Sequence, residues 1–160
     1  MNDNQLVELQ NVDEAQLRDI ANELAGLVYP PLVIFLDGPL GAGKTSFARA
    51  LIQGLGYADR VKSPTYSLLE SYTLDGVDVV HLDLYRINDP GELEFLSLDD
   101  MAAATICLVE WAENGLSALP DPDMILELDW SGETRDMCFI GKTQKGRTLM
   151  ESVAWSAYAN

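Results

Sequence analysis

The chain has 160 residues, 48% of them hydrophobic, and ten basic against 26 acidic residues give it a formal net charge of −16. This length accommodates one domain rather than two, so we expect residues 1–160 to form a single domain. The charge argues against extensive direct contact with nucleic acid, because such contact depends on Lys and Arg side chains that displace counterions from phosphates. One histidine and two cysteines also exclude a Cys/His zinc site.

The apolar runs and the first residues of the chain indicate where the protein resides. The longest apolar runs, residues 32–36 and 106–109, are typical of buried strands and are far too short to cross a bilayer. Residues 1–4 are polar and acidic, which is not typical of a signal peptide. We therefore expect a cytoplasmic protein with no membrane partner.

Helical and strand patterns alternate along the chain. Apolar residues at helical spacing predict a first helix that begins after a cap at Asn11 or Asp13 and is stopped by Pro30-Pro31. Helices before and after the strands, with two hairpins, predict a three-layer α/β domain with a mixed β-sheet flanked by helices. In chain order we predict a helix at 13–28, a strand at 32–36, a helix at 46–55, a hairpin of strands 66–73 and 77–85, a short helix at 92–96, a strand at 104–111, a hairpin of strands 124–130 and 134–141, and a helix in the tail.

The segment Gly38-Pro-Leu-Gly-Ala-Gly-Lys-Thr45 matches the phosphate-loop pattern G-x-x-x-x-G-K-[ST], between a predicted strand and a predicted helix. Glycines let backbone N–H groups approach phosphate oxygens, and the positive end of the following helix adds to the attraction. We expect Lys44 to reach the β- and γ-phosphates and the Thr45 hydroxyl to bind Mg²⁺. The predicted nucleotide-binding residues here are Gly38, Leu40, Gly41, Ala42, Gly43, Lys44, Thr45 and Ser46.

Two carboxylates at predicted strand ends, Asp83 and Glu110, are candidates for the acidic Mg²⁺ partner of this loop. The residues leave open which of the two binds the metal and which orients water, so both join Thr45 as predicted metal ligands. The chain has no N-K-x-D segment, which guanine-specific proteins use to read the base, and this favours ATP over GTP.

Thr65 and Trp111 complete the predicted site. Thr65, in the segment 63–65, suits a residue that senses the γ-phosphate through Mg²⁺, and the alternative is an ordinary turn or strand start. Trp111 follows Glu110 and is expected to line the nucleotide pocket, the alternative being a tryptophan of the core. His81 is interpreted as a strand residue with a satisfied hydrogen-bond partner.

The ordered blocks G-P-L-G-A-G-K-T, V-K-S-P-T-Y, H-L-D-L-Y-R and V-E-W-A-E resemble the TsaE family over residues 12–136. The resemblance implies a P-loop NTPase fold and an ATPase required for making N6-threonylcarbamoyladenosine at position 37 of bacterial tRNA. It also implies that Thr65 is a switch-like threonine, Asp83 the metal partner, Glu110 the essential carboxylate and Trp111 a residue beside the site. With this resemblance, Glu110 and Lys44 are the predicted catalytic residues.

The same resemblance implies protein partners. Family members work with a TsaB–TsaD heterodimer and support its repeated turnover, so we expect hydrolysis that is slow alone and depends on the partner. The acidity of the chain agrees with indirect contact to tRNA. Three departures from the family pattern are Pro39, Ala15 and Asn114, and the last removes a frequent arginine to which no role is assigned.

Two other functions compete with this one. A small-molecule or nucleotide kinase would use the same loop, but kinases of this kind need several arginines around the transferred group, and the six arginines here are scattered. A non-catalytic scaffold would need only nucleotide binding to order a partner surface. A basic cluster near the end of the chain would either close over the nucleotide, face tRNA or form a solvated hairpin; it consists of Arg135, Lys142, Lys145 and Arg147.

Overall fold

The computed structural model describes residues 5–65, 67–74 and 76–159. Residues 1–4, Tyr66 and Asp75, which entered the predictions of location and of the first hairpin, lie outside the described residues. The elements are β1 (Gln5–Val12), α1 (Glu14–Ala25), β2 (Leu32–Asp37), α2 (Lys44–Gly54), β3 (Leu69–Leu74), β4 (Val77–Asp83), the 3-10 helix η1 (Pro90–Leu96), α3 (Leu98–Ala102), β5 (Ile106–Glu110), the 3-10 helices η2 (Ala112–Asn114) and η3 (Leu116–Ala118), β6 (Met124–Ser131), β7 (Thr134–Gly141), α4 (Gln144–Glu151) and the 3-10 helix η4 (Trp155–Tyr158).

The described strands form one sheet with the order β1-β7-β6-β2-β5-β4-β3. Strand β2 is central and pairs in parallel with both β5 and β6, while β4 pairs in parallel with β5. The two predicted hairpins, β3–β4 and β6–β7, are antiparallel, and β1 adds to β7 in the same way. The sheet is therefore mixed, as predicted.

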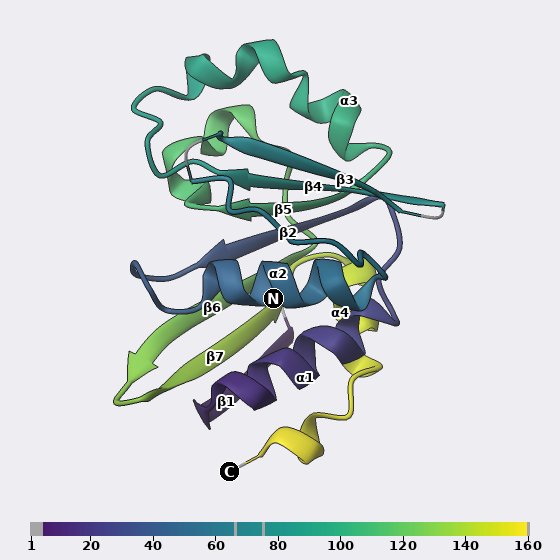
Figure 1. Ribbon diagram of the computed structural model, residues 1–160, viewed down its shortest axis with the longest axis vertical. Helices are drawn as coiled ribbons and strands as arrows, with labels where there is room; N and C mark the ends of the chain where they lie inside the picture. Colours follow the sequence, from purple (N-terminus) through teal and green to yellow (C-terminus); the bar gives the residue numbers. More distant parts are fainter. Residues whose placement is uncertain (1–4, 66, 75, 160) are drawn as a thin grey trace.

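Alternate residues of β2 bury opposite faces of the sheet. Leu32, Ile34 and Leu36 pack in the core shared with α1, α2 and α4. Val33 and Phe35 pack in a second core, which the sheet shares with η1 and α3. Figure 1 shows the resulting layers, with α1 and α2 over one part of the sheet and α3 at the top of the view. The three-layer α/β fold is confirmed.

The bounds of the first helix differ from the prediction. Asp13 is the N-cap: its Oδ1 accepts from the Gln16 backbone N–H at 2.8 Å, and the Gln16 side chain accepts from the Asp13 N–H. The helix ends at Ala25 with Gly26 as its C-cap. The prediction that Pro30-Pro31 stops it was therefore wrong, because the chain leaves the helix one turn earlier.

Strand β1 was not predicted at all. Its partner is β7, and the register of the pair shifts between Leu9 and Val12. This bulge disturbs the alternation of apolar and polar residues that marks a strand, so Leu9 and Val12 are both buried although they lie three positions apart. The other predicted strands exist. Strands β3, β4 and β5 are shorter than predicted, whereas the bounds of β2, β6 and β7 differ from the prediction by at most one residue.

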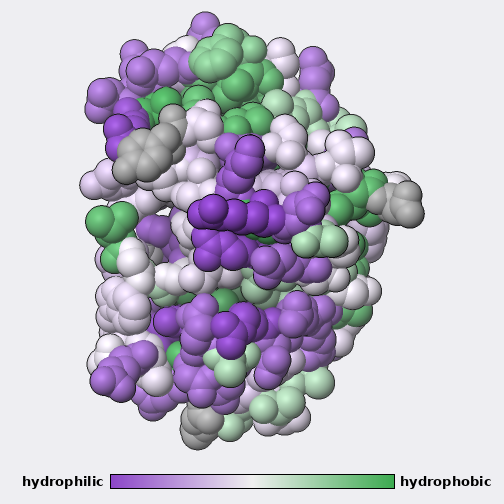
Figure 2. Space-filling model, in the orientation of Figure 1, coloured by the Kyte–Doolittle hydropathy of each residue, from purple (hydrophilic) through white to green (hydrophobic). Residues whose placement is uncertain are grey.

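The surface is mainly hydrophilic on the side formed by α1 and α2. Figure 2 shows this face, on which hydrophobic residues gather mostly at the top of the view, over η1. In the described part of the chain, no helix has the length and apolar character that a membrane span requires.

Candidate nucleotide site

The predicted phosphate loop joins the end of β2 to the start of α2. Its three glycines, Gly38, Gly41 and Gly43, have φ angles of 147°, 81° and 110°, which L-residues with side chains rarely adopt. A Cβ on Gly38 would also lie 2.3 Å from the backbone oxygen of Leu128 in β6. At Gly38, the close approach of the loop to β6 therefore leaves room only for glycine. Helix α2 begins directly afterwards at Lys44, so its N-terminus faces the loop.

Lys44 is 4% exposed and has no carboxylate at ion-pair distance in the described part of the chain. Its Nζ donates to the carbonyl oxygen of Gly38 and, at 3.4 Å, to that of Pro39. The same nitrogen lies 3.7 Å from the centre of the Trp111 ring. Burial lowers the pKa of Lys44, and four nearby carboxylates, Glu110 foremost, oppose this shift. The ammonium therefore interacts with two backbone carbonyl dipoles and with the face of the Trp111 ring. A bound anion can replace these partners.

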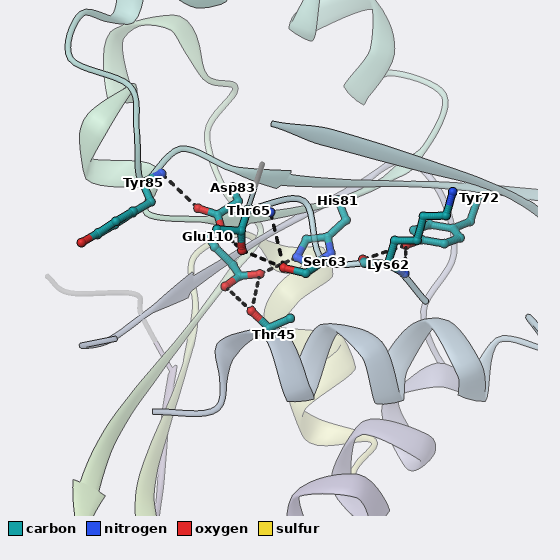
Figure 3. Close-up of polar contacts among 9 residues, drawn as sticks. All are labelled: Thr45, Lys62, Ser63, Thr65, Tyr72, His81, Asp83, Tyr85 and Glu110. Atoms are coloured by element: carbon teal, nitrogen blue, oxygen red, sulfur yellow. Dashed lines mark hydrogen bonds and ion pairs between the residues drawn. The ribbon is translucent and has the colours of Figure 1, made fainter. Parts of the chain in front are cut away.

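Thr45, Glu110 and His81 form a chain of hydrogen bonds that runs from the cavity wall into the protein (Figure 3). The Thr45 hydroxyl lies 2.9 Å from Oε1 and 3.2 Å from Oε2 of Glu110, at the end of β5. His81 Nε2, on the neighbouring strand β4, lies 2.6 Å from Glu110 Oε2. The exposed fractions of Glu110 and His81 are 2% and 0%. The partner expected for His81 is thus the predicted catalytic carboxylate, although its Nδ1 has no hydrogen-bond partner among the described residues.

Asp83 and Glu110 stand opposite each other in the parallel pair β4–β5. Asp83 Oδ1 accepts from the Tyr85 backbone N–H at 3.0 Å, and Oδ2 lies 3.4 Å from the Thr65 hydroxyl. Burial raises the pKa of Asp83, with a further rise from the charge of Glu110, while the Tyr85 N–H opposes it. The two carboxylates are therefore adjacent and partly desolvated, which is a favourable setting for a cation.

The segment that carries Thr65 is tied to the sheet by a tyrosine. Ser63 Oγ lies 2.7 Å from Thr65 Oγ1, which links the two hydroxyls (Figure 3). At the residue before Ser63, the backbone N–H of Lys62 donates to the Tyr72 hydroxyl, and this hydroxyl donates to the Lys62 carbonyl oxygen, both at 3.1 Å. Tyr72, on β3, is 4% exposed and packs edge-on against Tyr57. This double contact fixes the chain immediately before Ser63.

Trp111 lies beside the loop rather than in the centre of a core. It has a left-handed φ of 58°, its ring centre lies 5.0 Å from that of Tyr85, and it covers Lys44. Asn114 donates from Nδ2 to the Leu84 carbonyl oxygen at 2.9 Å and so ties η2 to the end of β4. The positive φ of a tryptophan is uncommon and is held here by the contacts around it.

A cavity of about 370 Å³ brings most of the predicted site residues together. Ala42 is fully buried, and Gly38 lies against β6, so these two predicted residues are not on the cavity wall. Tyr85 and Arg86 are wall residues to which the sequence had assigned no nucleotide role. The wall consists of Leu40, Gly41, Gly43, Lys44, Thr45, Ser46, Thr65, Asp83, Tyr85, Arg86, Glu110 and Trp111.

The basic residues predicted as one cluster are divided between the two ends of β7. Arg135 is the second residue of β7 and lies behind the loop, 6% exposed, where its Nη1 lies 2.8 Å from Glu14 Oε2. A Cβ on Gly43 would lie 3.5 Å from Arg135 Nε. Lys142, Lys145 and Arg147 follow the other end of β7, and Lys145 packs over the Tyr29 ring. The cluster therefore cannot close over the nucleotide as a unit.

The donor atoms at the site suit a hard cation. Thr45 offers a hydroxyl and Asp83 and Glu110 offer carboxylates, all at the wall of one cavity. Mg²⁺ prefers oxygen ligands of this kind and completes its shell with waters and phosphate oxygens of the substrate. The residues therefore fit Mg²⁺ bound together with a nucleotide.

Comparison with known proteins agrees with this geometry. A family model described as "Threonylcarbamoyl adenosine biosynthesis protein TsaE" matches residues 11–137. The chain belongs to the TsaE family. A tRNA threonylcarbamoyladenosine biosynthesis protein TsaE from Haemophilus influenzae is 40% identical over 130 residues, which cover 81% of this chain and 79% of that protein. A TsaE from Bacillus subtilis is 31% identical over 147 residues, covering 91% and 92%.

The TsaE fold is also seen in a solved structure. The crystal structure of YdiB from Bacillus subtilis superposes with a TM-score of 0.82 at 25% sequence identity, over 98% of this chain and 99% of that one. The resemblance drawn from four short blocks is therefore confirmed as membership of the TsaE family, and the expected P-loop NTPase fold is confirmed with it.

Proposed function

We propose that this chain is an ATPase of the machinery that makes N6-threonylcarbamoyladenosine at position 37 of tRNA. The single observation that carries the proposal is the meeting of Thr45, Asp83 and Glu110 beside the glycine loop. A loop of this kind binds phosphates, and two carboxylates next to its hydroxyl are what hydrolysis assisted by Mg²⁺ requires. The names of the relatives support the tRNA process.

Binding begins with the exchange of partners at Lys44. Phosphate oxygens carry more negative charge than the Gly38 and Pro39 carbonyls, so they attract the ammonium more strongly. The backbone N–H groups of the loop and the N-terminus of α2 add further donors. Leu40, Gly41, Ser46 and Trp111 line the same cavity and enclose the nucleotide.

The carboxylates act on the metal and on water. When bound, Mg²⁺ would be held by Thr45 and Asp83, with Glu110 within reach, and would neutralise charge on the phosphates. Glu110 orients the attacking water and takes its proton as the water oxygen bonds to the γ-phosphorus and the bond to ADP breaks. Thr65, next to Asp83, closes on the γ-phosphate side.

The proposed protein partners would speed ATP hydrolysis and would make most of the contacts with tRNA. Arg135 is paired with Glu14 behind the loop, which leaves Arg86 as the arginine on the cavity wall. We expect slow hydrolysis by the isolated chain, with a TsaB–TsaD heterodimer that completes or orders the site. With a net charge of −16, the chain leaves most contacts with tRNA to that partner.

Reconstituted tRNA modification tests the proposal. We expect TsaB–TsaD to turn over repeatedly only when this chain and ATP are present. Lys44→Ala should abolish both nucleotide binding and this turnover, and Lys142→Ala, an exposed lysine after β7, should leave both intact. The proposal fails if turnover is the same without the chain.

The same assay separates the competing functions. If Glu110→Ala abolished hydrolysis but supported modification in full, the chain would be a nucleotide-dependent scaffold rather than a working ATPase. Labelled γ-phosphate found on an acceptor molecule instead of in free phosphate would indicate a kinase.

A further inference from the structure

The strongest unassigned feature is the contact between His81 and Glu110. His81 Nε2 lies 2.6 Å from Glu110 Oε2, and His81 is 0% exposed (Figure 3). We propose that His81 is a positioning residue that holds the Glu110 carboxylate in the orientation needed for ATP hydrolysis. This inference rests on the proposed ATPase function and names a residue to which neither the motif nor the phosphate chemistry assigns a role.

The hydrogen bonds around the imidazole indicate which atom donates. An ionised Glu110 can only accept, so the proton between the two side chains belongs to His81 Nε2. The other ring nitrogen, Nδ1, is buried without a hydrogen-bond partner in the described part of the chain. A proton on Nδ1 would be an unsatisfied buried donor, whereas a bare lone pair is a smaller loss. Nε2 of His81 is therefore the atom that donates to Glu110.

The sheet brings the two side chains together. Residues two apart on a strand share a face, so His81 and Asp83 both project to the side of β4 on which Glu110 lies. The terminal torsion of a glutamate is broad, and a buried carboxylate with one donor can rotate about it. With His81 on Oε2 and Thr45 on Oε1, Glu110 has a donor at each oxygen. The rotation is then restricted, and the plane of the carboxylate is defined.

The role of Thr45 makes this restriction matter. A bound Mg²⁺ takes a lone pair of the Thr45 oxygen while the hydroxyl proton still points to Glu110, so Thr45 has to serve both the metal and the carboxylate. Among the described residues, His81 has no such second partner at Nε2 and is the donor that serves Glu110 alone. It holds the carboxylate in place at the moment when Glu110 has to direct the attacking water.

A pair of amide variants tests the inference. Glutamine places its amide donor where His81 Nε2 lies, whereas the asparagine side chain is one carbon shorter and does not reach Glu110. We expect H81N to lower kcat for ATP hydrolysis roughly 10- to 100-fold with KM changed less than about threefold, as for other outer partners of an active-site ligand. H81Q should recover most of kcat, since both variants keep a polar, uncharged side chain in the buried position.

A double-mutant cycle shows whether His81 acts through Glu110. In an E110Q background, H81N should cause little further loss of kcat, because the group it positions is already gone. A second cycle measures the free energy of unfolding of the nucleotide-free proteins. It should show coupling between the two positions, a readout that needs no bound nucleotide.

Equal kcat values for H81N and H81Q would overturn the inference, and so would independent, multiplying losses in the H81N/E110Q protein. A loss of stability in H81N with unchanged kcat would assign the contact to the fold alone. These outcomes differ from failure of the proposed function, in which the unmutated chain itself hydrolyses no ATP with its partners present.

Discussion

The ammonium of Lys44 lies 3.7 Å from the centre of the Trp111 ring and bonds to the backbone carbonyls of Gly38 and Pro39. A cation this close to an indole is attracted by the ring face. Phosphate oxygens compete for the same ammonium, so nucleotide binding should draw Lys44 away from the tryptophan and change the surroundings of its ring.

This change is measurable by fluorescence. We expect ATP with Mg²⁺ to alter tryptophan emission, and we expect Trp111→Phe to remove most of the change. Trp155→Phe is the matched control, because Trp155 packs on Phe139 in the α4 region away from the cavity. A change in emission that survives in Trp111→Phe and disappears in Trp155→Phe would contradict the expectation.

Gly38→Ala should destabilise the protein by roughly 2–4 kcal/mol. The new Cβ would meet the Leu128 backbone oxygen at 2.3 Å, and the φ of 147° would add strain. Gly132→Ala is the control: its φ of 66° is also left-handed, but nothing lies within 4 Å of the added atom. That control should cost only about 1–2 kcal/mol. Urea unfolding measures the loss of stability in each variant. Equal losses would show that the contact between Gly38 and β6 does not limit the size of the residue at position 38.

Tyr72→Phe should loosen the segment before Ser63. The change removes the hydroxyl that bonds to both backbone groups of Lys62, at an expected cost of about 1–2 kcal/mol. The Lys62 amide should then exchange its hydrogen faster, and KM for the Mg²⁺–ATP complex should rise because Thr65 is held less well.

The matched control for that variant is Tyr158→Phe. Its hydroxyl bonds to Glu23 on α1, away from the cavity. We expect a similar loss of stability with no change of KM. If both variants raised KM alike, the effect of Tyr72 would be on the fold as a whole.

Asp37, at the end of β2, should make the protein less stable as the pH rises. Burial and the charges of Glu113 and Glu127 raise its pKa from 3.8 to about 6, although Lys44 opposes the shift. The folded chain therefore holds this proton more tightly than the unfolded chain, and ionisation of Asp37 lowers the free energy of unfolding. The contribution is favourable at low pH and is lost between about pH 4 and pH 6.

Asp37→Asn should remove this dependence. We expect the variant to unfold at higher urea concentration than the unmutated chain at pH 7.5, with the gap narrowing toward pH 4. Asp59→Asn, at an exposed position, controls for the loss of one negative charge. A gap that is the same at every pH would rule out ionisation of Asp37 as its cause.

The parts of the site that were predictable are those set by local sequence. A glycine pattern with a lysine at this spacing is typical of a phosphate-binding loop, so this part of the site could be predicted. Asp83 and Glu110 could be predicted because each ends a run of residues with a strong strand pattern. The layers followed from the same patterns. Strand β1 was missed because its bulge breaks the alternation, and the end of α1 was misplaced because Gly26 was passed over for a more prominent proline pair.

The contacts that were not predictable depend on register between distant strands. His81 was expected to have a partner, but only the parallel pairing of β4 with β5 shows that this partner is Glu110. The separation of Arg135 from the other basic residues likewise depends on the length of β7, which places them at opposite ends of the sheet. Closeness in the sequence therefore does not indicate which of these side chains lie close together in the fold.

The parallel pairing of β2 has a consequence for synthesis of the chain. Leu32 pairs with Ile106, and Ile34 pairs with Met124, so the strand that leads into the loop acquires its neighbours only when much later residues have emerged. Closing such long segments is slow compared with forming helices. A nascent chain that ends before β5 contains the whole glycine motif but lacks Glu110 and the β6 backbone behind Gly38. Nucleotide would therefore bind only to the finished fold and stabilise it by mass action.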